Sequence, residues 1–555
     1  MNASHVELTG SRRPPGKGSR RVRDVDPHAL IELTITLSAP PLPGPDAMPS
    51  APMSPAEFAK NYGVSDSDVQ KVESVLRGFG LTIQGVSADR RSVRVSGSAA
   101  SVEAAFQPNM AVYHSATLGE YRGREGMLSI PAALDGLVTA VLGIDQRQVA
   151  HRKVAKKGAA RASVAPALAL AGGPLTPDEL EQRYDFPPGD GAGQVIAVAE
   201  FGIPINDSTV LAPAYIPDDV SAFCGKYNRH VPQIVIVPVN LAPLTPAQLA
   251  ALPRQARDAS ADITGEVMMD IEIIASLCPR ATINVYFASF DQKGWVDLLD
   301  EVISGQPARP VTLSISWGMA EDSPDWSQSA LSEINNRLQA AAMQGITVCV
   351  ASGDDGSGDQ INDNRGHADF PASSPFVLGV GGTMLELAGT EVGWWQSPGR
   401  RNGKGGGATG GGVSAITARP AWQKVTVPSI NPASIDGRVV PDVAALAGSP
   451  GYDLILFGEE SSAGGTSASA PVWAALLTRI NAKLPAGKQQ RFLTPLLYGV
   501  DGNGQPIGIS AFRDISKGKN VSSPNPGRGY MSGAGYDAVT GWGAPVGMAL
   551  LAALS

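Results

Sequence analysis

A serine in a run of small residues is the first position in this chain that could carry out a reaction. Ser467 follows Gly464, Gly465 and Thr466 and precedes an apolar run over 472–477. A small-residue turn that leads directly into a helix places a serine hydroxyl at the helix N-terminus, where backbone N–H groups and the helix dipole favour developing negative charge. That position suits a nucleophile. A residue that only caps the helix would produce the same short pattern. The distinction between a nucleophile and a helix cap therefore depends on other residues of the chain.

A serine nucleophile needs a base within hydrogen-bond reach, and histidine most often supplies it. Four of the six histidines lie within the first 151 residues, outside the region that contains Ser467. The other two, His230 and His367, do not stand in a glycine-rich context at a strand end. The sequence therefore disfavours a histidine base and directs attention to carboxylates.

Two carboxylates four residues apart are the strongest candidates for the base. On a helix, Glu266 and Asp270 would lie on one face, with Val267, Ile271 and Ile274 forming an apolar stripe beside them. Carboxylates this close titrate together and one apparent pKa is raised, so the pair can accept and return a proton at acidic pH. A solvated acidic helix face is the alternative interpretation.

A third acidic position follows an apolar run over 346–352. The run ends in Gly353, Asp354, Asp355 and Gly356, which predicts a buried β-strand with acids at its carboxyl end. Sheets of α/β proteins present catalytic groups at this end of their strands. Asp354 is therefore a further candidate.

These three blocks, in this order, resemble the sedolisin family of serine-carboxyl peptidases, and most closely its kumamolisin branch. The resemblance implies that Ser467 is the nucleophile, Glu266 the general base and acid, Asp270 its orienting partner and Asp354 the acid of the oxyanion hole. No catalytic position is substituted. The similarity spans essentially residues 30–550 and includes segments at 313–318, 369–375, 379–383 and 440–444.

The resemblance implies an acid-active serine endopeptidase, made as a self-processing zymogen and secreted. A tripeptidyl-peptidase of the same family is the nearest alternative, and a non-catalytic binding protein that keeps the fold is an alternative of a different class. Trp317 and Asp369 resemble residues that line the family's subsites, which implies a preference for basic or polar side chains near the cleaved bond. The expected partners are protein or peptide substrates and the chain's own prodomain.

A second group of residues, near the C-terminus, could hold a metal. Calcium takes six or more oxygen ligands, which carboxylates and backbone carbonyls exposed by glycines can supply. Read alone, the pattern would suit an ordinary turn. Resemblance to the kumamolisin calcium site implies one bound Ca²⁺, with ligands from the carboxylates of Asp514 and Asp537 and the carbonyls of Ile515, Gly533 and Gly535.

Composition indicates a globular protein of two domains, since the chain has 555 residues, 43% hydrophobic and 17% charged. No apolar run approaches the roughly 18 residues that span a bilayer. Residues 1–23 lack the apolar core of a conventional secretory signal, although the resemblance leads us to expect an extracellular protein. Three cysteines are too few for a disulfide framework or a zinc site. We expect a monomer without nucleic-acid or membrane partners.

Charge is distributed unevenly along the chain. Residues 1–172 carry 20 Lys and Arg against 15 Asp and Glu, whereas the remainder has a net charge of −13. Opposite signs favour association of the two parts at neutral pH and weaken it when carboxylates become protonated. The sequence thus predicts a pH-sensitive contact between them, unless the basic excess belongs to a disordered tail.

The N-terminal part is expected to contain three regions. Residues 1–29 are predicted to be disordered. Residues 30–150 show a βαββαβ pattern with a last strand at 111–113, which is typical of a ferredoxin-like domain, and the resemblance makes this domain an inhibitory prodomain. Residues 151–174, rich in Lys, Ala and Gly, are predicted to form an exposed linker that contains the activation cleavage site.

Residues 175–555 alternate strands and helices over most of their length. This alternation predicts a parallel sheet with helices on both faces, a doubly wound α/β fold. The resemblance implies the subtilisin-like form of that fold for the catalytic domain.

Overall fold

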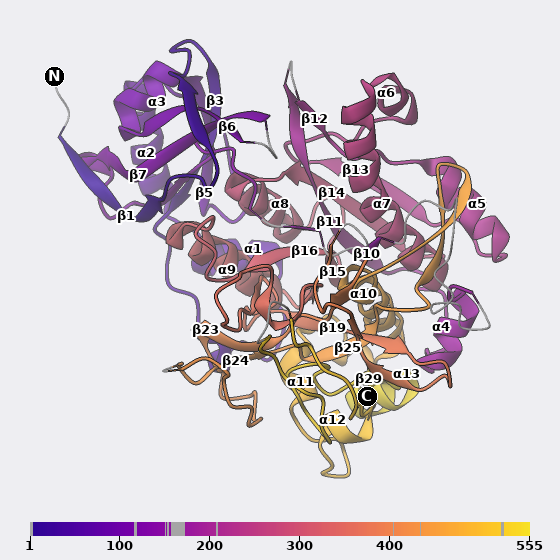
Figure 1. Cartoon of the computed structure of the whole chain (residues 1–555). Coiled ribbons are helices and arrows are strands. Elements are labelled where there is room, and N and C mark those ends of the chain that lie inside the picture. Colours follow the sequence, from indigo (N-terminus) through magenta and orange to yellow (C-terminus); the bar gives the residue numbers. More distant parts are fainter. Residues whose placement is uncertain are drawn as a thin grey trace.

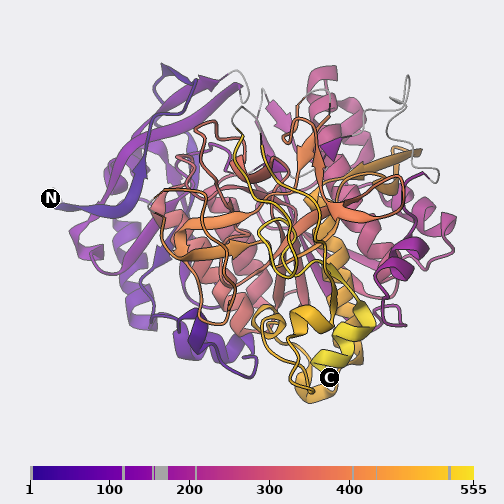
Figure 2. The same cartoon turned by 60° about the horizontal axis from the view of Figure 1, so that its bottom comes forward.

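The structure is a computed structural model. It describes residues 4–115, 119–149, 173–206, 209–402, 405–432, 434–522 and 527–555, together with the backbone of residues 151–152 and 155–156. An N-terminal domain, indigo to purple, lies beside a larger C-terminal domain, magenta to yellow (Figure 1, Figure 2). Among the described residues, no helix combines the length and apolar character needed to cross a membrane.

The first sheet of the N-terminal domain has ferredoxin-like connections. Its antiparallel strands lie in the order β4-β5-β3-β8, and three helices connect them. The prediction that the strand at 111–113 would complete this sheet is wrong, because β8 does so. The elements are β3 (Leu30–Leu37), α1 (Pro55–Tyr62), α2 (Asp66–Gly78), β4 (Thr82–Val86), β5 (Ser92–Ser98), α3 (Ala99–Phe106) and β8 (Val138–Leu142).

A second sheet extends this domain, in the order β1-β7-β6-β2. The prediction of disorder over 1–29 is wrong, since strands β1 and β2 lie in that range. The polar side chains of these strands led to the prediction of disorder, because their partners are remote in sequence. Arg13, for example, is buried, and its Nε lies 3.1 Å from Asp145 Oδ2. The strands are β1 (His5–Arg13), β2 (Arg20–Arg23), β6 (Asn109–Ser115) and β7 (Gly119–Pro131).

The C-terminal domain is built on one mainly parallel sheet. The strand order is β13-β14-β11-β15-β17-β19-β20; β12 pairs with β11 and β25 runs parallel beside β19. Only β12 and β20 pair antiparallel to their neighbours in this sheet. The strands are β11 (Val195–Asn206), β12 (Thr209–Leu211), β13 (Gln233–Pro238), β14 (Thr282–Ser289), β15 (Thr312–Ile315), β17 (Thr347–Ala351), β19 (Leu378–Leu385), β20 (Glu391–Gly393) and β25 (Val443–Leu446).

Helices cover both faces of this sheet, which confirms the doubly wound α/β prediction. Residues of α7 (Arg254–Leu277) and α10 (Thr466–Lys483) share one buried apolar cluster, and those of α8 (Gln292–Ser304) and α9 (Gln328–Met343) share another. Smaller helices lie at the periphery: α4 (Pro177–Arg183), α5 (Pro217–Lys226), α6 (Pro246–Ala251), α11 (Thr494–Leu497), α12 (Ile507–Ser510) and α13 (Gly547–Leu554).

Helices α8 and α9 also form the platform on which the N-terminal domain docks. Hydroxyl groups on strands β3, β5 and β8 of that domain donate hydrogen bonds to carboxylates of the two helices. Thr34 donates to Asp297 at 2.6 Å, and Ser92 donates to Asp300 at 2.5 Å. Thr139 donates to the carboxylate of Glu333 at 2.7 Å.

The platform carboxylates are paired with cations of the same two helices. Lys293 Nζ lies 2.6 Å from Asp297 Oδ2, and Arg337 Nε lies 2.9 Å from Asp300 Oδ1. Arg337 also pairs with Glu333. The docking contact is therefore buried, ionic and hydrogen-bonded.

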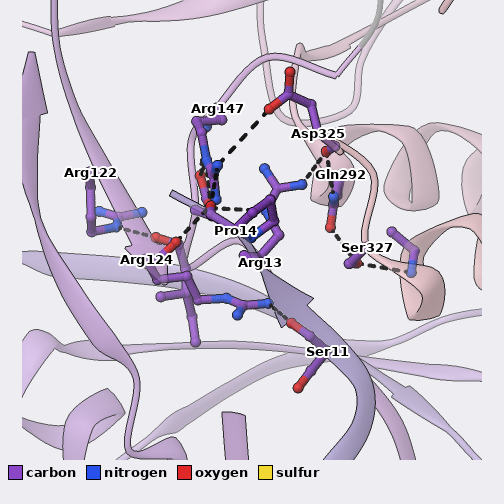
Figure 3. A network of polar contacts seen from close by, with 12 residues as sticks. Ser11, Arg13, Pro14, Arg122, Arg124, Arg147, Gln292, Asp325 and Ser327 are labelled. Atoms are coloured by element: carbon purple, nitrogen blue, oxygen red, sulfur yellow. Dashed lines mark hydrogen bonds and ion pairs between the residues drawn. The ribbon is translucent and has the colours of Figure 1, made fainter. Parts of the chain in front are cut away.

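Arg13 of β1 and Arg147, which follows β8, make a separate contact with the C-terminal domain, shown in Figure 3. Arg13 and Arg147 point toward Asp325, which precedes α9. Arg147 Nη1 lies 4.0 Å from Asp325 Oδ1, and Arg13 donates to the carbonyl of Asp325. Arg147 also holds Asp145 at 2.6 Å. The residues predicted to be disordered thus take part in domain docking.

Candidate active site

Ser467 lies at the N-terminus of α10, as the sequence predicts. Gly465, directly before the helix, has a φ of 107°, a conformation that side-chain-bearing residues rarely adopt. Ser467 itself is fully buried. Pro471 lies within the helix and has no backbone N–H, so the carbonyl of Ser467 cannot accept the usual hydrogen bond from four residues on.

Ser316 connects this serine to the carboxylates of α7. The hydroxyl of Ser467 donates to the backbone carbonyl of Ser316 at 3.3 Å. The side-chain oxygen of Ser316 lies 2.7 Å from Asp270 Oδ2 and 3.2 Å from the carbonyl oxygen of Ser467. The nucleophile candidate and the carboxylate candidate are thus joined through one residue.

Glu266 and Asp270 lie on α7, one turn apart, and both are fully buried. Burial raises the pKa of Asp270 to about 8, although the hydrogen bond from Ser316 acts to lower it. A solvated acidic face is therefore excluded. A buried carboxyl with a pKa in this range can hold a proton near neutral pH and exchange it during a reaction.

Glu200, on β11, joins the same cluster and is also fully buried. Burial first, and then the charges of Asp270 and Glu266, raise its pKa well above the ordinary value. Trp317 Nε1 donates to Glu200 Oε2 at 3.2 Å. Sequence reasoning missed Glu200 and Ser316; the only signal for Glu200 is a charged residue within an apolar strand.

Asp354 lies just beyond the carboxyl end of β17, as predicted, and contacts the start of α10. Its Oδ1 accepts hydrogen bonds from the backbone N–H and the hydroxyl of Thr466, both at 2.8 Å. Its Oδ2 lies 3.7 Å from Arg401 Nη1 and makes no hydrogen bond within the described part of the chain. Burial raises the pKa of Asp354 to about 7, although Arg401 and Thr466 act to lower it.

The neighbouring Asp355 has the opposite character. Arg401 Nη2 lies 2.5 Å from its Oδ2, and Gln360 donates to the same oxygen at 2.8 Å. Burial opposes ionisation, but Arg401 outweighs burial and keeps the pKa of Asp355 below its ordinary value. Of the two adjacent aspartates, Asp354 is the one that can carry a proton.

The two histidines of the C-terminal domain are bound away from Ser467. The ring nitrogens of His367 lie 2.8 Å from Asp322 and 2.9 Å from Asp363. His230 Nδ1 lies 3.1 Å from the carbonyl of Pro279. Each of these two histidine rings thus has hydrogen-bond partners other than Ser467.

Two short strands place part of the chain against this site. β9 (His151–Arg152) pairs antiparallel with β16 (Trp317–Ala320), so that Arg152 lies opposite Trp317. β10 (Ala155–Lys156) pairs with β27 (Glu459–Gly464), which directly precedes the turn into α10; β27 itself pairs with β26 (Tyr452–Leu456). The described residues 151–152 and 155–156 therefore pair with β16, which directly follows Ser316, and with β27, which directly precedes the turn that leads to Ser467.

Of the two residues predicted to bind substrate, Trp317 belongs to β16 and lies opposite Arg152, whereas Asp369 lies on the other side of β16 from β9. Asp369 lies on β18 (Asp369–Phe370), which pairs antiparallel with β16. A Cβ atom added to Gly318 would lie 2.1 Å from Asp369 Oδ1, so only glycine fits under this carboxylate. Both predicted residues thus border the strand that pairs with the chain segment, although each is buried.

The residues predicted to bind calcium lie close together. Gly535 N–H donates to Asp514 Oδ2 at 3.0 Å, and Gly533 N–H donates to Asp537 Oδ2 at 2.9 Å. Burial raises the pKa of Asp537, so a cation there would favour its ionised form. Within the described residues, no group of three or more His, Cys, Asp or Glu could hold a metal. An oxygen site of two carboxylates and backbone carbonyls remains compatible with this arrangement.

Comparisons with known families match both domains. Residues 17–147 match the model described as "Pro-kumamolisin, activation domain", and residues 261–496 match the "Subtilase family" model. The chain is 36% identical to kumamolisin of Bacillus sp. (strain MN-32) over 511 residues, which cover 90% of this chain and 85% of that protein.

Two further relatives are named as tripeptidyl-peptidases. Tripeptidyl-peptidase sed5 of Aspergillus fumigatus is 29% identical over 97% of this chain and 95% of its own length. Human tripeptidyl-peptidase 1 is 33% identical over 52% of this chain and 51% of its own length. Among solved structures, Pseudomonas sedolisin, a serine-carboxyl proteinase, aligns with a TM-score of 0.54 and 23% identity over 68% of this chain and 97% of its own, which supports the fold.

Proposed function

Because this chain belongs to the sedolisin family of serine-carboxyl peptidases and carries an N-terminal activation domain, we propose that it is an acid-active endopeptidase made as a self-processing zymogen. The observation that supports the proposal is the pairing of residues 151–152 with β16, which follows Ser316, and of residues 155–156 with β27, which leads to Ser467. A substrate for hydrolysis would lie in the same way.

In the proposed mechanism, Ser467 Oγ attacks the peptide carbonyl while Glu266 takes its proton. Asp354, when protonated, donates a hydrogen bond from Oδ2 to the oxyanion that forms. Glu266 then passes the proton to the leaving amine, and the C–N bond breaks. A water molecule hydrolyses the resulting ester by the reverse proton transfers and releases Ser467. Asp270 orients Glu266 throughout.

The course of the segment favours an endopeptidase over a tripeptidyl-peptidase. Upstream of the paired residues, the carbonyl of Val149 accepts from Trp295 Nε1 at 2.9 Å, and its N–H donates to the carbonyl of Phe290 at 3.3 Å. The chain therefore continues in contact with the C-terminal domain beyond the residues paired with β16. An enzyme that removes tripeptides needs a closed end there to hold a free amino terminus.

The pairing also supports an expectation about where the precursor is cleaved during activation. Lys153 and Val154, which lie outside the described residues, separate the two paired dipeptides. We expect a first cut between Arg152 and Ala155, followed by a second cut in the rest of the linker, up to residue 174. The mature enzyme would begin shortly before Leu175.

Acidification of the purified full-length protein tests this proposal. Intact mass should show cleavage within 151–174, and the product should cleave long peptides into fragments of varied length. Ser467→Ala and Glu266→Gln should both stay full length, with melting temperatures close to that of the unaltered protein. Release of tripeptides alone would favour the tripeptidyl-peptidase, and failure of a serine-directed covalent probe to label Ser467 would favour a non-catalytic homologue.

We also propose that the C-terminal loop binds one calcium ion, through Asp514 and Asp537 and the carbonyls of Ile515, Gly533 and Gly535. The support is the oxygen-only donor set and the convergence of the two segments that supply it. A ligand that binds only the folded state stabilises it by mass action. Calcium should therefore raise the melting temperature of metal-free protein, and Asp537→Ala should abolish the rise; an equal rise in both would refute the site.

A further inference from the structure

The side chain of Ser316 lies between two hydrogen-bond acceptors in the centre of the site. Its Oγ is 2.7 Å from Asp270 Oδ2 and 3.2 Å from the backbone carbonyl oxygen of Ser467. A hydroxyl has one proton to donate and can accept as well. Ser316 can therefore satisfy only one of these two acceptors at a time.

The second acceptor is available because of the sequence of α10. In a regular helix, the N–H of residue 471 would bond to the carbonyl of Ser467. Proline occupies position 471 and has no N–H, so this carbonyl depends on a side chain for its hydrogen bond. Ser316 is the side chain that the structure places there, and both serines are fully buried.

We propose that Ser316 is a positioning residue that keeps Asp270 Oδ2 hydrogen-bonded in both protonation states of Asp270, because its hydroxyl can exchange this oxygen for the carbonyl of Ser467 as its acceptor. When Asp270 is ionised, the Ser316 hydroxyl donates to it. When Asp270 is protonated, its O–H donates to Ser316 Oγ, and the Ser316 hydroxyl rotates to donate to the carbonyl of Ser467. The change requires only rotation of two O–H groups, with no movement of heavier atoms.

The surroundings of Asp270 make such a device useful. The titratable groups that face it are Glu266 from its own helix and Glu200 from β11, and α10 presents Ser467. Neither Glu200 nor Asp270 has an ion pair among the described residues, so no fixed cation compensates a change of charge. An unpaired buried polar group would oppose one protonation state. This inference rests on the proposed function, in which Asp270 supports the proton transfers of Glu266.

Ser316→Ala tests the inference, and Ser314→Ala is its matched control. Ser314 is a fully buried serine on the same stretch of chain, and its hydroxyl makes no hydrogen bond within the described residues. Loss of the hydrogen bond to ionised Asp270 should lower kcat about tenfold to a hundredfold with little change in KM. The acidic limb of the kcat profile should move to higher pH, because the ionised form loses its donor. Ser316→Thr should restore both, and Ser314→Ala should resemble the unaltered enzyme.

Pro471→Ala should have the opposite effect on pH. The new N–H would bond to the carbonyl of Ser467, so the arrangement that accommodates protonated Asp270 would be lost and the acidic limb should move to lower pH. The inference would be overturned if Ser316→Ala and Ser314→Ala gave the same pH profile of kcat. It would also be overturned if Pro471→Ala did not move the acidic limb of that profile to lower pH. If Glu266→Gln remained active, the proposed function would fail instead, so the two failures can be told apart.

Discussion

Two of the buried carboxylate groups in this molecule, one at the docking platform and one beside Ser467, differ in their cations. At the docking platform, Asp297 pairs with Lys293, and Asp300 and Glu333 share Arg337. In the catalytic centre, Glu200 and Asp270 have no ion pair among the described residues and receive their hydrogen bonds from the neutral groups of Trp317 and Ser316.

The neighbours of a buried carboxylate therefore determine whether it is suited to docking or to chemistry. Burial raises the pKa of Asp300 to about 6 because Arg337 offsets much of the effect, whereas burial raises that of Asp270 to about 8. Near neutral pH the platform therefore presents charge to the hydroxyls of the prodomain. In the candidate catalytic centre, by contrast, the raised pKa of Asp270 favours a proton that would be available for exchange in the proposed reaction.

The direction of these pKa shifts determines how acid changes the stability of the folded precursor. A carboxyl whose pKa is raised by folding contributes stability at low pH and loses it as the pH rises through the folded-state pKa, so protonation of Asp300 below about 6 favours the folded precursor. At the second contact, burial opposes ionisation of Asp145, but Arg13 and Arg147 keep its pKa well below the ordinary value. Neither of these two shifts destabilises the folded precursor in mild acid, and we therefore expect the pH dependence of processing to originate in the candidate catalytic centre rather than in the charge difference between the domains.

Removing the platform cation should have the largest effect on stability. In a Ser467→Ala background that cannot process itself, Arg337→Met would leave Asp300 and Glu333 buried without their cation. Loss of one partner of a buried ion pair costs about 3 to 5 kcal/mol. Urea denaturation at neutral pH measures this loss. Arg254→Met, which removes an exposed cation, is the control, and equal stability of the two variants would contradict the comparison.

Removing hydroxyls from the prodomain side should have a smaller effect. Thr34→Val combined with Ser92→Ala deletes two donors to platform carboxylates while nearly preserving their shapes. Processing should become about tenfold faster or more at each acidic pH tested, since each such hydrogen bond contributes about 1.5 to 3 kcal/mol. The pH of half-maximal processing should stay the same. A shift of that pH would show that the platform senses acid, and Thr82→Val on an exposed strand position serves as the control.

Much of the centre could be predicted from the sequence because its groups carry recognisable local patterns. Glu266 and Asp270 have helical spacing, Ser467 follows a glycine turn and Asp354 ends an apolar strand. Ser316 and Glu200 could not be predicted in this way, because each is a single residue whose partner is distant in sequence. The same reason explains the errors in the prodomain.

In the prodomain, β1 is polar and is held by contacts with β7 and with the C-terminal domain, which no local pattern reveals. The strand that completes the first sheet, β8, pairs with β3 across a long stretch of sequence. Hydrophobic alternation identified the strand at 111–113 correctly but could not assign it to a sheet. Non-local pairing was therefore the main limit of the prediction.

The pH profile of turnover in the Asp354→Asn variant of the mature enzyme tests the central claim most directly. Asp354 can donate to the oxyanion only while protonated, and its pKa of about 7 should set the alkaline limb of the unaltered enzyme. Asparagine donates at any pH, so its alkaline limb should extend upward until the Glu266 and Asp270 pair limits the rate. Asp354→Ala should lose about a hundredfold to a thousandfold at every pH. An alkaline limb that Asp354→Asn leaves in place, together with normal acidic turnover in Asp354→Ala, would contradict the account.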